Sequence, residues 1–154
     1  MNGDQLTYFP DILKKIDPGL FPTDVLFGPG GFTLFDDLAA MLVRFSGFDI
    51  FLVLFFLTIL TRFVYFYGLY RIILYFTENR MAAFLTPILF LSGFIIYGTG
   101  MRTIAPMLLP KYMAIAVCLL GLSLLFEKKI IWSALAFGAG FIFHPSGPLP
   151  FLVV

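Results

Sequence analysis

Long apolar runs separated by short polar turns dominate the last two thirds of the sequence. The runs cover residues 48–76, 81–98, 107–126 and 130–144, and charged or turn-forming residues separate them. A run of about 20 apolar residues is long enough for a helix that crosses the roughly 30 Å hydrocarbon core of a membrane. The pattern therefore predicts about four membrane-spanning helices, followed by the start of a further helix at 149–154.

Residues 1–47 follow a different pattern, rich in turn formers and aspartates, and are predicted to form an external loop. The stretch 9–16 has room for one or two helical turns. Within 32–46, apolar side chains recur at the i, i+3, i+4, i+7 and i+8 positions of a helix: Phe35, Leu38, Ala39, Leu42 and Val43. Such an amphipathic helix lies in the membrane interface, with Asp36 flanking its apolar stripe. The alternative is that it begins the first span, but the Ser-Gly pair that follows favours a break before the transmembrane bundle of 48–154.

Composition supports the membrane class. The chain is 60% hydrophobic and 12% charged, with a mean hydropathy of +0.99, whereas soluble domains are about 45–50% apolar and about 25% charged. So few charges cannot cover a soluble surface. The net charge is only +1 and the sequence has no basic stripe, which argues against a nucleic-acid-binding protein. The predicted fold class is an all-α polytopic transmembrane bundle, in which the single cysteine, Cys118, is a buried thiol.

The stretch 130–147 combines small residues with the single histidine of the chain, His144. Its small pairs at four-residue spacing, Ala134/Gly138 and Ala136/Gly140, predict faces that pack closely against neighbouring helices. Because the sequence begins in a polar loop and stops within an apolar stretch, we expect a fragment of a longer polytopic protein.

Counting crossings assigns each polar segment to a membrane face. The turns at 78–80 and 127–129 lie on one face, called side Y, and the loop 1–47 lies on the other, called side X. Side X then carries many polar residues, Lys111 among them, and four of these are the candidate site residues: Asp4, Asp24, Arg102 and His144. The numbers of basic residues on the two faces do not decide which is cytoplasmic. The position of the basic residues of side Y in tight turns favours side Y as cytoplasmic and side X as external.

The residues that share side X suit chemistry on a phosphate-bearing lipid. A carboxylate serves as a general base or holds a divalent cation, an arginine clamps phosphate, and a histidine transfers a proton or binds an anionic oxygen. For each residue alone, the alternative is structural: solvated turn aspartates, and a histidine that ends a helix. Motifs of phosphate-loop ATPases, dinucleotide enzymes, zinc proteases and serine hydrolases do not occur in the sequence.

Three segments carry a family resemblance: GDQLTYFPDILKKIDPGLFPTD at 3–24, TLFDDLAAMLVRFSGFD at 33–49 and KKIIWSALAFGAGFIFHPSG at 128–147. In style and order they are similar to the first external loop, the juxtamembrane helix and a later His-Pro-ended helix of the multi-spanning C-type (GT-C fold) membrane glycosyltransferases. The resemblance implies transfer of a sugar from a polyprenyl-phosphate-linked donor at the external face of a bacterial inner membrane.

The same resemblance implies roles for the four residues of side X. Asp4 matches the loop acid that acts as base or metal ligand, and Asp24 is a second external acid. Arg102 and His144 are expected near the donor phosphate, and a divalent cation is a possible cofactor. On this resemblance we expect the sequence to lack the family's first span and C-terminal part, and therefore to be inactive by itself.

Two other functions fit the pattern. In a transporter or channel subunit, Arg62 and His144 line a pathway through the membrane. In a non-catalytic membrane scaffold, side X has no groove. The partners expected in every case are the lipid bilayer and no nucleic acid, with a polyprenyl-phosphate sugar added in the glycosyltransferase.

Overall fold

The described part of the chain is almost entirely helical. The computed structural model describes residues 3–20, 34–90, 95–96, 101–102, 110–145, 148 and 151, and gives their side chains except at 3–9, 90, 95–96 and 101–102. Within these residues the secondary structure is helical apart from one pair of two-residue strands. The chain divides into two compact units, Met1–Leu57 and Thr58–Val154. The all-α prediction is confirmed at this level.

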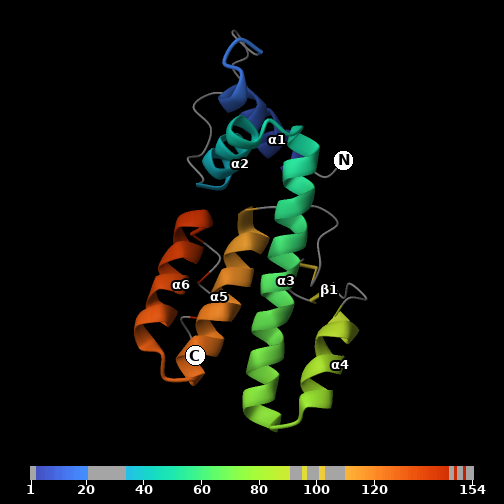
Figure 1. Cartoon of the computed structure of the whole chain (residues 1–154), viewed down its shortest axis with the longest axis vertical. Helices are drawn as coiled ribbons and strands as arrows, with labels where there is room; N and C mark the ends of the chain where they lie inside the picture. The colour runs from blue at the N-terminus through green and yellow to red at the C-terminus, as the bar shows by residue number, and fades with distance from the viewer. Residues whose placement is uncertain are drawn as a thin grey trace. The chain divides into compact units, whose positions relative to one another are not determined.

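Unit 1 contains a pair of packed helices, α1 (Gly3–Ile16) and α2 (Leu34–Ser46) (Figure 1). The first of them is longer than the one or two turns predicted for 9–16. Ile12 of α1 and Phe35 of α2 are both at 1% exposure, so they form the centre of this unit's apolar core.

The buried face of α2 differs from the predicted stripe. Its buried residues are Phe35, Asp36, Ala39 and Ala40, whereas Leu42 and Val43 are half-buried. The buried face is therefore rotated by about one residue, and Asp36, predicted at the flank of the stripe, is fully buried. Hydrophobic spacing defines an apolar arc, but the contact with α1 decides which part of that arc is covered.

The break predicted between α2 and the first apolar run is confirmed. Gly47 ends α2 with a φ of +66°, the left-handed conformation that glycine adopts without strain. Asp49 then caps the next helix, because its Oδ1 accepts a hydrogen bond of 2.8 Å from the Phe51 N–H. Helix α3 runs over Ile50–Thr77, close to the predicted 48–76.

Among the described residues, α3 is the one helix that is long and apolar enough to cross a membrane. Its 28 residues make a helix of about 42 Å, longer than the roughly 30 Å hydrocarbon core. The other apolar helices are shorter: α4 (Arg80–Phe90), α5 (Pro110–Phe126) and α6 (Ile130–Phe143). At 11, 17 and 14 residues, they reach about 16, 25 and 21 Å. The predicted four-span bundle therefore remains a prediction.

Helix α4 ends earlier than the predicted segment 81–98. Asn79 caps its start by accepting hydrogen bonds from the backbone N–H groups of Met81 and Ala82 at 2.9 and 3.2 Å. Pro87 inside the helix has no N–H to donate to the Ala83 carbonyl, which weakens the turn that precedes it. Beyond Phe90 the described backbone is extended: β1 (Ile95–Ile96) pairs antiparallel with β2 (Met101–Arg102), and Ile95 lies opposite Arg102.

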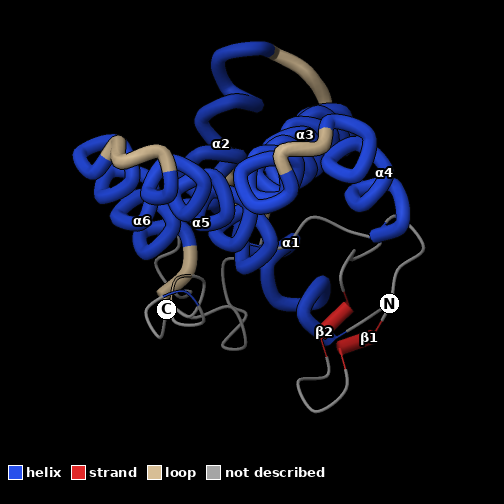
Figure 2. The backbone as a smooth tube through the Cα atoms, turned by 90° about the horizontal axis from the view of Figure 1, so that it is seen from below, coloured by secondary structure: helices blue, strands red, loops and turns tan. Residues whose placement is uncertain are grey.

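In unit 2, α5 and α6 lie side by side and antiparallel, joined by the turn at 127–129 (Figures 1 and 2). Glycines allow the close approach. A Cβ built at Gly121 of α5 lies 3.1 Å from the Ala136 Cβ, and one built at Gly140 of α6 lies 2.5 Å from the Cys118 Sγ. Cys118 is fully buried, as predicted. Of the two predicted small faces, the one with Ala136 and Gly140 packs, and the one with Gly138 is exposed.

Helix α3 also contacts α5 within unit 2. A Cβ at Gly68 lies 3.0 Å from the backbone nitrogen of Leu120, so the two helix backbones approach closely there. Nearer the ends of the helices, the Phe126 ring stacks on Tyr75, with ring centroids 5.3 Å apart, and meets Phe76 edge to face. Much of the remaining apolar surface of α3 is exposed, including Phe55, which is 58% exposed.

Candidate functional site

The end of the α5–α6 pair away from its connecting turn brings two basic side chains together. Lys111 is the second residue of α5, and His144 directly follows α6. Since the helices are antiparallel, both residues lie at the same end, as the counting of crossings predicts. The His144 backbone N–H closes α6 with a 3.0 Å hydrogen bond to the Gly140 carbonyl.

The electrostatics of this pair favour a neutral imidazole. Burial lowers the pKa of His144 below its usual value, and the nearby positive charge of Lys111 lowers it further. At neutral pH the pair therefore combines one ammonium group with an uncharged ring that both donates and accepts hydrogen bonds. Such a pair can attract an anionic oxygen and then accept a proton.

The four residues predicted to share side X are described to different extents. Asp4 is the second residue of α1, and Arg102 lies in β2, but their side chains are outside the described set. Asp24 lies outside the described residues altogether. Within the described part of the chain, no three metal-binding side chains cluster. The joint site and its divalent cation remain predictions. Lys111, which was predicted on side X but not as a site residue, is the charged neighbour that the structure gives to His144.

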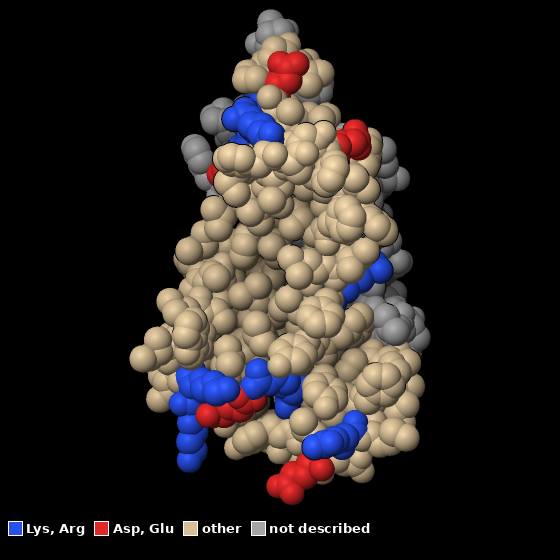
Figure 3. Space-filling model, viewed as in Figure 1, with Lys and Arg blue, Asp and Glu red and all other residues tan. Residues whose placement is uncertain are grey.

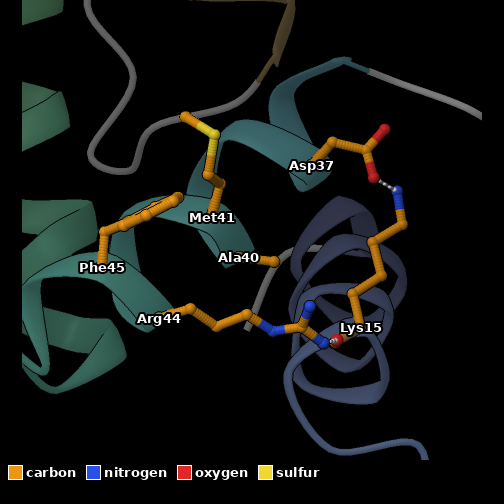
Figure 4. A pocket seen from close by; sticks show the side chains of 6 residues that line it. All are labelled: Lys15, Asp37, Ala40, Met41, Arg44 and Phe45. Atoms are coloured by element: carbon orange, nitrogen blue, oxygen red, sulfur yellow. Dashed lines mark hydrogen bonds and ion pairs between the residues drawn. The ribbon is translucent and has the colours of Figure 1, made fainter.

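A second polar arrangement, in unit 1, clamps α1 to α2 (Figure 4). Lys15 Nζ lies 2.6 Å from Asp37 Oδ1, and Arg44 Nη2 donates a 2.5 Å hydrogen bond to the Lys15 carbonyl. These groups line an open hollow of about 490 Å³, whose α2 side also carries Met41 and Phe45. The Lys15 ammonium and the Arg44 guanidinium therefore both have partners within unit 1. The sequence signal for the clamp is the basic doublet in α1 and the acidic doublet in α2.

The exposed apolar side chains beside this clamp agree with an interfacial position for α2. Phe45 is 85% exposed and Met41 is 47% exposed. An amphipathic helix in a membrane interface presents basic groups to lipid headgroups and large apolar groups to the acyl region. The arrangement around the hollow therefore suits contact with a lipid surface.

The opposite end of unit 2 gathers charged residues from two turns and from α3 (Figure 3). Arg71 of α3 forms an ion pair with Glu127, which also lies 3.0 Å from Lys129 through its other oxygen. The Arg71 guanidinium carbon lies 5.5 Å from the centre of the Tyr67 ring. Among the described residues, this end carries four basic and two acidic side chains: Arg71, Arg80, Lys128, Lys129, Glu78 and Glu127. This is the end predicted as side Y.

No protein-family model, curated protein or solved structure matches the chain.

Proposed function

We propose that the chain is part of an integral membrane protein, with about four crossings, that binds a polyprenyl-phosphate-linked sugar and transfers the sugar at the external face. The observation that carries the proposal is the Lys111–His144 pair at one end of two apolar helices. A phosphate on an apolar tail has the complementary chemistry, since its tail suits the exposed helix faces and its charge suits the ammonium group. The C-type glycosyltransferase resemblance supplies the reaction.

In this proposal His144 and Lys111 bind the donor phosphate, with Arg102 as a further clamp. Asp4 is the general base that activates the acceptor hydroxyl, and Asp24 assists it or shares a divalent cation with it. The site lies on the external face of a bacterial inner membrane. Large exposed apolar side chains on α3, α4 and α6, such as Phe63, Phe84 and Trp132, support a bilayer as the surrounding solvent.

The titration of His144 tests donor binding directly. Because the chain has one histidine, its imidazole gives a single assignable NMR signal in detergent micelles. We expect a pKa below the usual value of about 6.5, and a higher pKa in Lys111→Gln, in which the neighbouring charge is lost. Added polyprenyl phosphate is expected to raise the pKa, because a bound anion stabilises the imidazolium form.

The matched control for this titration is the uncharged polyprenol, which has the same tail and no phosphate. If Lys111→Gln shifts the pKa but polyprenyl phosphate does not, the pair is a structural contact and the donor-binding proposal is wrong. An equal shift with polyprenol also contradicts it, because the tail alone then changes the environment of His144.

Cysteine labelling tests whether α6 crosses the bilayer. Single cysteines at the exposed positions Lys128 and Pro145 bracket the helix, in a Cys118→Ala background. We expect a membrane-impermeant thiol reagent, applied to intact cells, to label Pro145→Cys from outside and to label Lys128→Cys only after the membrane is opened. Labelling of both from one side shows that α6 does not cross, and the reversed pattern shows that the orientation is wrong.

A further inference from the structure

Unit 2 also contains an apolar hollow, which lies away from the Lys111–His144 pair. Helices α3 and α4 enclose an open hollow of about 270 Å³, which holds about nine groups of the size of a water molecule. Its walls are mainly aromatic. They include Phe63, Phe66, Tyr67 and Tyr70 of α3, with Phe84 and Ile88 of α4.

The walls of the hollow follow helical stripes and are open on one side. The α3 residues have i, i+3, i+4 and i+7 spacing, so they share one face of the helix. Phe63 is 66% exposed, Phe84 is 60% exposed and Ile88 is 44% exposed. Large aromatic groups exposed beside a hollow favour an apolar, flexible occupant over water.

The hollow ends towards the charged end of unit 2. Arg80, the first residue of α4, precedes Phe84 by four positions, so both lie on the same face of the helix. Arg80 is exposed and has no ion pair within the described residues, whereas the neighbouring Arg71 is paired with Glu127. An apolar hollow that leads to an available arginine is complementary to an anionic head on an apolar chain.

We propose that the α3–α4 hollow binds one acyl chain of an anionic glycerophospholipid, whose phosphate contacts Arg80. The excess of basic over acidic residues at this end selects an anionic headgroup. Tyr67 and Tyr70 lie where the acyl chain of the lipid would meet its headgroup, a level at which tyrosine is enriched in membrane proteins. The site is independent of the proposed donor site, since it lies at the opposite end of the helices and uses none of the same residues.

Tryptophan quenching by brominated lipid measures the selectivity at the hollow. The chain has one tryptophan, Trp132, so Trp132→Phe with Phe84→Trp moves the fluorophore to the wall. This variant is reconstituted into vesicles of phosphatidylcholine and phosphatidylglycerol in which one lipid at a time is brominated. We expect lipid binding beside the introduced fluorophore to favour phosphatidylglycerol about fivefold, the effect of one basic residue near an anionic lipid surface.

Three further substitutions in this background assign the selectivity to Arg80. Arg80→Gln is expected to bring the preference close to one, and Arg80→Lys, which keeps the charge, is expected to retain most of it. Lys128→Gln removes the same charge from the other turn and is expected to leave the preference unchanged. Raised salt concentration is expected to weaken the preference, because the headgroup contact is electrostatic.

Each opposite result overturns the proposal. Equal quenching by the two brominated lipids shows a hollow without headgroup selectivity. A preference that survives Arg80→Gln, or that is lost equally in Lys128→Gln, shows attraction by the whole surface and no discrete site. Weak quenching by both lipids shows that protein, either a second copy or another chain, covers the hollow.

Discussion

Replacement of Gly140 by alanine is expected to destabilise the packing of α5 against α6 by about 1–3 kcal/mol. The added Cβ lies 2.5 Å from the Cys118 Sγ and 3.2 Å from the Ala114 carbonyl oxygen. The sulfur belongs to a fully buried side chain, and the carbonyl belongs to the backbone of α5. The helices must therefore separate slightly, and a leucine at this position is expected to separate them further.

The native Cys118 reports this separation, so no cysteine has to be introduced. Its thiol is fully buried against α6 and it is the single cysteine of the chain. A small uncharged thiol reagent in detergent micelles should react with it only when the helix pair opens. Since about 1.4 kcal/mol corresponds to a factor of ten in an equilibrium constant, Gly140→Ala is expected to accelerate labelling by roughly fivefold to 150-fold.

Gly138 provides the matched control, two residues away on the same helix. A Cβ there meets nothing within 4 Å, so Gly138→Ala is expected to be neutral or to stabilise the helix by up to about 1 kcal/mol. Removal of the sulfur in Cys118→Ala should relieve most of the cost of Gly140→Ala, as measured by thermal unfolding. Equal effects of alanine at 138 and 140 would show that helix propensity, not the contact with α5, determines the result.

The sequence predicts helices better than it predicts their faces. Helices α3, α5 and α6 match apolar runs bounded by polar residues. The caps of Asp49 on α3 and of Asn79 on α4 are local interactions. In α6 two small pairs are equally good packing faces by spacing, and only the position of α5 selects the one with Gly140. The burial of Asp36 likewise does not follow from the apolar spacing of α2. Contacts between elements, which a periodic pattern does not contain, decide these cases.

In the candidate site, too, some features follow from the order of helices along the sequence and others depend on contacts between helices. Alternation of helices along the chain is enough to place His144 at the end opposite the turn at 127–129, and this does not require knowledge of any contact. The proximity of Lys111 depends on the antiparallel pairing of α5 and α6, which follows from the short turn between them. The clamp of Lys15 on Asp37 has a signal in the two charged doublets, but its formation depends on the packing of α1 against α2, which the sequence pattern does not contain. The early end of α4 was missed because the apolar run 81–98 has no break in its hydrophobic pattern where the helix gives way to the β1–β2 hairpin.

Loss of the Glu127 charge is expected to have the second large effect on unit 2. The carboxylate pairs with Arg71 of α3 and with Lys129 of the turn, and so connects α3 to the α5–α6 pair. The side chains of Arg71 and Glu127 are only 19% and 29% exposed. In Glu127→Gln, the half-buried Arg71 charge keeps, among the described residues, the Tyr67 ring and a neutral amide, so we expect a loss of about 1.5–3 kcal/mol of unfolding free energy.

The reverse substitution is expected to cost less, because Arg71→Gln leaves Glu127 with Lys129 as a partner at 3.0 Å. Replacement of both residues by similar-sized apolar side chains, Arg71→Met with Glu127→Leu, is expected to cost less than Glu127→Gln alone, since no unpaired charge remains. Glu78→Gln is the control, because it is the same chemical change at an exposed position in the neighbouring turn, and it should stay within about 0.5 kcal/mol of the wild type.

Unfolding by SDS in mixed micelles measures all four variants. If Glu127→Gln and Glu78→Gln have equal effects, the ion pair does not stabilise unit 2, and the ring contacts of Phe126 with Tyr75 and Phe76 become the main connection between α3 and α5 at this end.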